Sequence, residues 1–251
     1  MERMHVLVTR TGAEGQTLVR TLDDLGLDAL HLPLVRLRGI GNPDQVRERF
    51  ASLPPVDGLI LTSREGVRQA AALGLLESQK CTLTVVPGPG TRSLAHEMGL
   101  RRACCPDPRA SNSEGMLAMD EMRRVTGMHW LILGAVDGRR LLDRTLEARG
   151  ADVRRLTVYE RCPEPPSEVA IERLHAARNW ITLLASGAAL DRLVNCLPGP
   201  LWEKLRLGTM LVPSERLRAR AIDCGVSKTV VCDGAGDQAM LDALKASTSG
   251  R

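Results

Sequence analysis

Short hydrophobic runs alternate along this chain with longer segments in which hydrophobic residues recur at helical spacing. Residues 6–9 form such a run, and an apolar stripe at helical spacing follows over residues 18–25. The runs at 59–61 and 130–133 are continuously apolar, which is typical of strands buried on both faces. Alternating strands and helices of this kind predict an α/β protein with parallel sheets covered by helices on both faces.

The pattern occurs twice, and each occurrence contains the same four units. Unit A is a strand, a helix and a strand (4–34 and 128–159), and unit B is a strand followed by Ser63 or Ser186. Unit C is a strand with a proline turn (85–91 and 210–215), and unit D is the last strand with its helix. The units recur after roughly 125 residues, far beyond the period of a solenoid of about 20–50 residues. We therefore predict two similar doubly wound parallel-sheet domains with a cleft between them, at the carboxyl ends of the strands.

The order of the units leaves two possible domain divisions. A simple split gives domains 1–125 and 126–251. The other division joins residues 1–36 and 162–251 in one discontinuous domain and inserts 37–161 as the second domain, so that the chain crosses twice. The segment Cys162-Pro163-Glu164-Pro165-Pro166 has the composition of a linker and lies at the second crossing. We favour the discontinuous division.

Composition limits the classes of partner. The 251 residues are 43% hydrophobic and 25% charged, as in an ordinary globular protein. Only 2% of the residues are aromatic, which leaves few surfaces on which bases could stack. The net charge is +4, and the sequence contains no block of basic residues. We expect no nucleic-acid partner.

Cysteine usage and hydropathy indicate the compartment. The seven cysteines are odd in number and contain no Cys-x-x-Cys pair, so we expect free thiols in a reducing environment. The N-terminal residues lack the apolar core of a signal peptide, and no apolar run approaches the roughly 20 residues of a membrane span. We expect a cytoplasmic protein that acts as a monomer and does not bind membranes.

Several small polar residues lie between a predicted strand and the helix that follows it. Ser63, Ser186 and Ser214 do so, and Gly90 and Thr91 begin the helix of the first unit C. Such residues serve as helix N-caps, which is one interpretation. The second is a ligand site, since helix N-termini carry free N–H groups and partial positive charge that bind carboxylates and phosphates.

Three larger side chains are further candidates. Arg10 and Arg139 follow equivalent strands of the repeat, where each is either a surface charge or a partner for an anion. Tyr159 is the only tyrosine and stands at the second predicted crossing. It either packs in the core or acts as a hydrogen-bond donor or general acid, because a phenol is protonated at neutral pH.

Other chemistries lack a sequence signal. The five histidines show no spacing typical of metal ligands, and no serine lies in a nucleophile elbow. The glycines at 88 and 90 are followed by Ser93 where a dinucleotide fingerprint requires glycine or alanine, and a Walker A motif is absent. We predict no metal site and no nucleotide cofactor.

Short motifs in order along the chain resemble the uroporphyrinogen-III synthase family. The motifs are Val8-Thr9-Arg10, Pro33-Leu34, Leu61-Thr62-Ser63, Gly88-Pro89-Gly90-Thr91, Ser113-Glu114-Gly115-Met116-Leu117, Arg139 with Leu142, Arg149-Gly150-Ala151, Val158-Tyr159-Glu160-Arg161, Ser186, and Pro213-Ser214-Glu215-Arg216. The chain departs from the family pattern at Thr11 and at Arg64-Glu65-Gly66, where local ligand contacts are expected to differ.

The resemblance implies two doubly wound domains joined by a two-strand connection. It also implies a cofactor-independent lyase that dehydrates and cyclises hydroxymethylbilane, a linear tetrapyrrole, with inversion of ring D to give uroporphyrinogen III. The family's tyrosine corresponds to Tyr159 and its threonine to Thr91. Ligand binding in the family is largely through backbone N–H groups in the cleft.

Two competing hypotheses remain at the level of sequence. One is a non-catalytic two-domain binder of a small polycarboxylate anion, which would share the cleft. The other is an inactive relative or a regulatory domain, against which the retention of Tyr159 and Thr91 argues.

Overall fold

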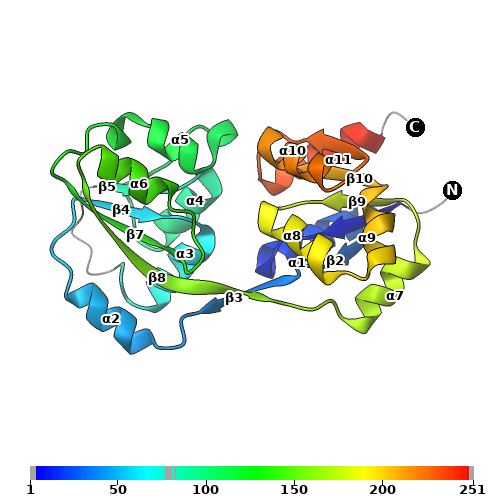
Figure 1. Cartoon of the computed structure of the whole chain (residues 1–251), viewed down its shortest axis with the longest axis horizontal. Coiled ribbons are helices and arrows are strands. Elements are labelled where there is room, and N and C mark those ends of the chain that lie inside the picture. Colours follow the sequence, from blue (N-terminus) through cyan, green and yellow to red (C-terminus); the bar gives the residue numbers. More distant parts are fainter. Residues whose placement is uncertain (1–3, 77–80, 82, 249–251) are drawn as a thin grey trace. The chain divides into compact units, whose positions relative to one another are not determined.

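The protein folds into two compact units. A computed structural model describes residues 4–76, 81 and 83–248. One unit is Met1–Arg36 with Cys162–Arg251, and the other is Leu37–Arg161. The chain passes between them within β3 (Val35–Gly39) and again within β8 (Asp152–Pro163), both of which are labelled in Figure 1.

The first unit is built on a parallel sheet. In its described residues the strand order is β11-β10-β9-β1-β2, and the hydrogen-bonded pairs run parallel. Its strands are β1 (His5–Val8), β2 (Asp28–His31), β9 (Trp180–Leu183), β10 (Thr209–Val212) and β11 (Lys228–Val231), and its helices are α1 (Gly12–Asp24), α7 (Glu168–Ala176), α8 (Gly187–Cys196), α9 (Gly199–Arg206), α10 (Glu215–Asp223) and α11 (Asp237–Thr248).

The second unit repeats this plan. The strand order over its described residues is β3-β8-β7-β4-β5-β6, and β8, β7, β4, β5 and β6 pair in parallel. Its remaining strands are β4 (Gly58–Leu61), β5 (Leu83–Val85), β6 (Ala103–Cys104) and β7 (His129–Ala135), and its helices are α2 (Pro43–Ala51), α3 (Arg64–Ala72), α4 (Pro89–Glu97), α5 (Ser113–Ala118) and α6 (Leu141–Ala148), with 3₁₀ turns at Pro108–Ala110 and Asp120–Met122.

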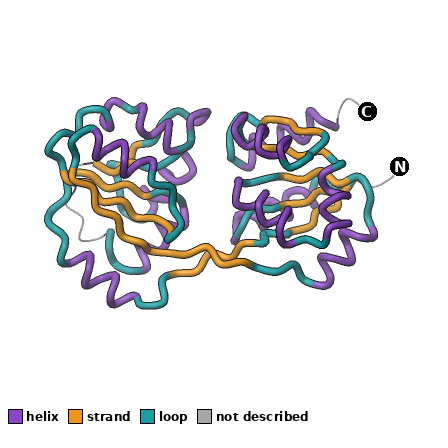
Figure 2. Tube along the Cα trace, viewed as in Figure 1, coloured by secondary structure: helices purple, strands orange, loops and turns teal. Residues whose placement is uncertain are grey.

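Each sheet is buried on both faces. In the first unit, Val6 and Val8 pack with α1 and α11, whereas Leu7 packs on the opposite face with α7 to α10. In the second, Leu131 and Leu133 pack with α2, α3 and α4, and the intervening Ile132 packs with α5 and α6. Figure 2 shows strands between helices in each unit. This confirms the predicted fold class of two similar doubly wound α/β domains.

The two sheets also share the order of the repeated units. From one edge, each sheet runs through the strand of unit D, then C, then B, then the two strands of unit A. In both units the polar residues that end strands of units A, B and C therefore meet at one edge of a sheet, because the carboxyl ends of parallel strands lie together.

The segment interpreted as a linker is partly strand. β8 continues through Pro163, and the backbone N–H of Glu164 donates to the carbonyl of Leu34. Arg36 and Arg38 on β3 form ion pairs with Glu164 and Glu160 at 2.6 and 2.7 Å. Pro163 is tolerated because it ends the strand, where its missing N–H breaks no interior ladder. No helix in the described part of the chain is long and apolar enough to cross a membrane.

Candidate active site

The carboxyl edge of the first sheet carries two serine-capped helices. Ser186 follows β9 and accepts a hydrogen bond from the backbone N–H of Ala189 at 3.2 Å. Ser214 follows β10 and accepts one from the N–H of Leu217 at 3.3 Å. Both serines therefore have the cap function that the sequence suggested, and the first-turn N–H groups of α8 and α10 point to this edge.

The second sheet has an equivalent edge. Ser63 follows β4 and caps α3 by accepting from the N–H of Gly66 at 3.0 Å. Helix α4 begins at Pro89 with Gly88 as its N-cap, so Gly90 and Thr91 lie in the first turn rather than before it. Thr91 is 8% exposed, and its backbone N–H donates to the carbonyl of Gly88 at 3.1 Å.

Tyr159 is placed at this edge by an irregularity between β7 and β8. Gly134 is paired with Thr157, but Ala135 is paired with Tyr159, so Val158 is an extra residue on β8. Successive residues of a regular strand face opposite sides of a sheet. The bulge instead turns Tyr159 to the face of Val158, and both pack in the core beside α3.

The hydroxyl of Tyr159 is held by two side chains. Its Oη lies 2.9 Å from Oγ of Ser63, and Nη2 of Arg161 donates to it at 3.2 Å. The guanidinium carbon of Arg161 also lies 5.6 Å from the centre of the phenol ring. Tyr159 is only 1% exposed, so its ring packs in the core while its hydroxyl contacts these two polar groups.

Arg161 is in turn held by an acid. Its Nη1 donates to Oδ1 of Asp137 at 2.6 Å. Asp137 lies just beyond the end of β7, and the N–H of Val136 donates to the carbonyl of Tyr159. Ser63 and Asp137 thus follow the ends of β4 and β7, and β8 supplies Tyr159 and Arg161. We call these four residues the Tyr159 cluster.

The predicted anion-binding arginines are both paired within their own unit. Nε of Arg10 lies 2.9 Å from Oδ1 of Asp237, at the start of α11. Nη1 of Arg139 donates to Oε1 of Glu114 in α5 at 3.0 Å. In each unit, an arginine of unit A pairs with an acid in the first turn of the unit D helix. A bound carboxylate would therefore share these guanidinium groups with a resident acid.

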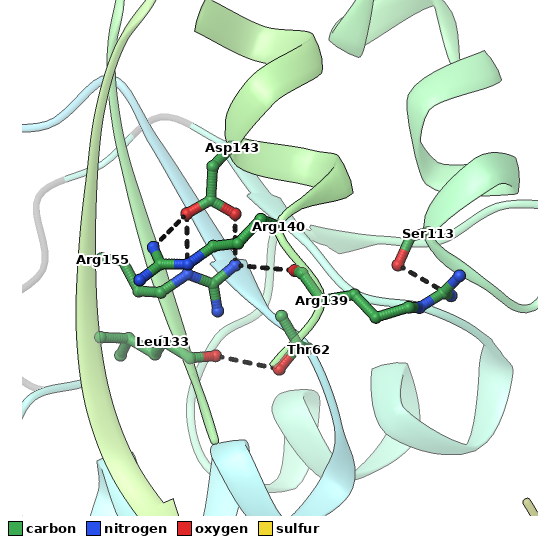
Figure 3. Close-up of polar contacts among 7 residues, drawn as sticks. All are labelled: Thr62, Ser113, Leu133, Arg139, Arg140, Asp143 and Arg155. Carbon is green, nitrogen blue, oxygen red and sulfur yellow. Dashed lines mark hydrogen bonds and ion pairs between the residues drawn. The ribbon is translucent and has the colours of Figure 1, made fainter. Parts of the chain in front are cut away.

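A buried ion pair supports the loop that carries Asp137 and Arg139 (Figure 3). Asp143 in α6 accepts from Nε and Nη2 of Arg155 at 2.8 and 2.5 Å and from Arg140 at 3.1 Å. Nη2 of Arg155 also donates to the backbone carbonyl of Arg139 at 3.3 Å. Burial alone raises the pKa of Asp143, but the hydrogen bonds and charge of Arg155 outweigh it and hold the pKa below its ordinary value.

One glycine near α4 lies in close contact with an arginine side chain. A Cβ on Gly90 would lie 2.1 Å from Nη2 of Arg64, the first residue of α3. The guanidinium group therefore lies directly against the Gly90 backbone, which places a positive charge at the N-terminus of α4. This contact lies at one of the positions where the chain departs from the family pattern.

Two of the cysteine thiols are held protonated by burial. Burial raises the pKa of Cys104 and of Cys232 to about 11, so both thiols are protonated and unreactive at neutral pH. Among residues 4–76, 81 and 83–248, no three His, Cys, Asp or Glu side chains lie together in a way that could hold a metal ion.

Comparison with known proteins settles the family. The family model described as "Uroporphyrinogen-III synthase HemD" matches residues 16–242. The chain belongs to the uroporphyrinogen-III synthase family. It is 32% identical over 250 residues to the uroporphyrinogen-III synthase of Escherichia coli strain K12, covering 96% of this chain and all of the relative. It is 31% identical to that of Salmonella typhimurium strain LT2 over the same shares of the two chains.

Solved structures give the same fold. The uroporphyrinogen-III synthetase of Helicobacter pylori 26695 has a TM-score of 0.63 at 14% identity, with 99% of this chain and all of that chain covered. A mutant uroporphyrinogen III synthase of the extremely thermophilic bacterium Thermus thermophilus has a TM-score of 0.61 at 18% identity, with the same coverage. The resemblance drawn from short motifs is thereby confirmed, and the hypothesis of a non-catalytic binder finds no support.

The sequence identified part of the site and missed the rest. Ser63 and Tyr159 were separate candidates, and the structure joins them. Asp137 and the role of Arg161 were missed, although Arg161 stands in the motif that carries Tyr159. The cap of α5 was also missed: Asn112, the residue before Ser113, caps this helix by accepting from the N–H of Gly115 at 2.8 Å.

We expect Asp143→Ala to destabilise the second unit strongly. Arg155 and Asp143 are 8% and 9% exposed, so removal of the acid leaves a buried cation uncompensated, at a cost of about 3–5 kcal/mol in the free energy of unfolding. Because the pKa of Asp143 is lowered in the folded state, this contribution is present above the ordinary carboxyl range and is lost as the pH falls below it. Denaturant unfolding of the wild type and of the Asp143→Ala variant, from pH 7 to pH 3, measures this difference in the free energy of unfolding.

The matched control is Asp120→Ala, which breaks an exposed pair with Arg123 at 3.4 Å. That change should cost less than about 1 kcal/mol. If both variants lose the same free energy of unfolding at pH 7, the buried pair is not what stabilises the loop.

Proposed function

We propose that Tyr159 is the proton source for the reaction of the uroporphyrinogen-III synthase family in this chain. That reaction dehydrates and cyclises hydroxymethylbilane, inverts ring D and yields uroporphyrinogen III. The observation that carries the proposal is the Tyr159 cluster, in which a phenol, a serine hydroxyl and an arginine meet at the carboxyl edge of a sheet. A hydroxide is a poor leaving group, so its departure calls for a proton donor.

The reaction uses one proton, which Tyr159 gives up at the start and regains at the end. The proton joins the substrate hydroxyl, the C–O bond breaks with its electron pair and water leaves. The positive charge on the carbon is shared by the adjacent pyrrole nitrogen. Ring D then attacks through its substituted carbon, and the bond that already joined this carbon to the methylene bridge of ring C breaks. The freed methylene carbon bonds to the unsubstituted α-carbon of ring D, and the proton lost from that carbon restores the phenol. Arg161 stabilises the phenolate in the meantime, because a charge-assisted hydrogen bond favours the anion.

Substrate binding is assigned to helix N-termini and to two arginines. The side chains or backbones proposed to contact the substrate are Arg10, Ser63, Gly90, Thr91, Arg139, Ser186 and Ser214. Backbone N–H groups at helix starts bind carboxylates without side-chain charge. The equivalent ion pairs of Arg10 with Asp237 and of Arg139 with Glu114 hold the guanidinium groups at the same edges. A cytoplasmic location is also part of the proposal, supported by seven free cysteines at positions that the structure describes. A monomeric state completes it.

We expect Tyr159→Phe to lower the rate of uroporphyrinogen III formation by about 10²–10⁴, the usual loss for a general acid. The linear substrate closes spontaneously to the unrearranged isomer, so the product of slow turnover should shift towards uroporphyrinogen I. Single-turnover assays with separation of the two isomers measure both effects.

The control for this substitution is Thr91→Ala. It removes at most one neutral hydrogen bond, worth roughly 0.5–1.5 kcal/mol or about tenfold in rate. A folded Tyr159→Phe variant with turnover close to that of the wild type would remove Tyr159 as the proton source and leave an ordered water or a substrate carboxylate in that role.

Uroporphyrinogen III should raise the thermal unfolding temperature under anaerobic conditions. A ligand that binds only the folded state stabilises it by RT ln(1 + [L]/Kd), about 2.7 kcal/mol at a ligand concentration of 100 Kd. The shift should shrink as salt is added, since contacts to carboxylates are screened. Absence of a shift at millimolar ligand and low salt would contradict binding by helix N-termini and arginines.

A further inference from the structure

The burial of Tyr159 raises the question of how its proton reaches a substrate. The residue is 1% exposed, whereas Ser63, whose Oγ lies 2.9 Å from the phenol oxygen, is partly exposed. Arg161 lies over the ring and also donates to the hydroxyl. The partly exposed neighbours of the phenol are thus a serine, which can pass a proton on, and an arginine, which at neutral pH cannot accept one.

The hydrogen bonds of the cluster favour one direction. Arg161 can only donate, so the phenol oxygen accepts from it. The N–H of Gly66 donates to Oγ of Ser63 at 3.0 Å. Either hydroxyl can donate in the remaining bond between Ser63 and Tyr159.

If Ser63 donated in that bond, the Tyr159 hydrogen would be left in the core. Among the described residues, the phenol oxygen has hydrogen-bond partners only in Ser63 and Arg161. An unsatisfied buried donor costs about 1–3 kcal/mol. If Tyr159 donates instead, the buried phenol hydrogen has an acceptor, and the hydrogen of the partly exposed Ser63 remains for an external acceptor.

We propose that Ser63 delivers the proton of Tyr159 to the leaving hydroxyl of the substrate. This route rests on the proposed function of Tyr159 and assigns the path that its proton takes. The Ser63 hydrogen forms the new O–H bond of the departing water while the Tyr159 hydrogen moves to Oγ of Ser63. The substrate C–O bond breaks with its electron pair, and the phenolate that remains is stabilised by Arg161, which Asp137 holds at 2.6 Å.

The proton route changes the expected effect of losing Ser63. As a helix cap and neutral hydrogen-bond partner, its loss would cost about tenfold in rate at most. If Ser63 is a member of the proton route, its loss removes general-acid catalysis altogether and lowers kcat by about 10²–10⁴. The difference between these two values makes the route testable.

The test compares Ser63→Ala, Tyr159→Phe and the double variant, with kcat and KM determined separately. We expect both single substitutions to lower kcat to a similar extent with little change in KM. The double variant should be no slower than either, since residues that act as one unit are not additive. Ser63→Thr keeps a hydroxyl at the same position and should restore most of kcat.

Ser167→Ala is the matched control for loss of a helix cap. Ser167 caps α7 by accepting from the N–H of Ala170 at 3.2 Å and has no place in the proposed site. Both serine substitutions should lower stability to a similar, modest extent, as is usual for loss of a cap. Only Ser63→Ala should lower kcat.

The outcomes separate the two levels of the proposal. If Ser63→Ala stays within about tenfold of the wild type while Tyr159→Phe is slow, Tyr159 acts directly and the Ser63 route is wrong. If Ser63→Ala and Tyr159→Phe are both slow but their losses multiply in the double variant, they act independently and the route is also wrong. If Tyr159→Phe is fast, both proposals fall.

Discussion

The site depends on one local constraint, the bulge that inserts Val158 between the paired residues of β7 and β8. A regular ladder would point Tyr159 to the face of the sheet that α5 and α6 cover, away from Ser63. The extra residue turns the phenol to the face of α3, where it meets the cap residue of that helix. Bulges often re-aim a side chain next to an active site, and this one joins a strand, a helix N-terminus and an arginine in a single hydrogen-bonded cluster.

Electrostatic support for this edge comes from pairs rather than from free charges. Arg161 forms an ion pair with Asp137, and Arg139 forms one with Glu114. The loop that carries Asp137 and Arg139 is supported by the buried pair of Asp143 and Arg155. Paired arginines keep fixed positions, which suits an enzyme that must hold a flexible linear substrate in one geometry. We propose that backbone N–H groups at helix starts supply most of the donors for a polycarboxylate.

The sequence predicted the fold better than the site. Strand positions followed from short apolar runs, and the order of repeated units matched the order of strands in each sheet. Tyr159 could be placed on the last strand of unit A, but its direction could not, because a bulge depends on the register with β7. The ion pairs of Arg10 and Arg139 were open to prediction, since their acids occupy the first turn of equivalent helices. Arg161 needed the structure, because it acts through a contact with its own strand.

The position of the hydrogen between Ser63 and Tyr159 is the most direct test of the proton route. Neutron diffraction from a deuterium-exchanged crystal of the free enzyme shows hydroxyl deuterium atoms directly. We predict the deuterium of Tyr159 on the line to Oγ of Ser63, with the deuterium of Ser63 directed away from the phenol. A deuterium of Ser63 directed at Oη of Tyr159 would reverse the chain of donors and contradict the route.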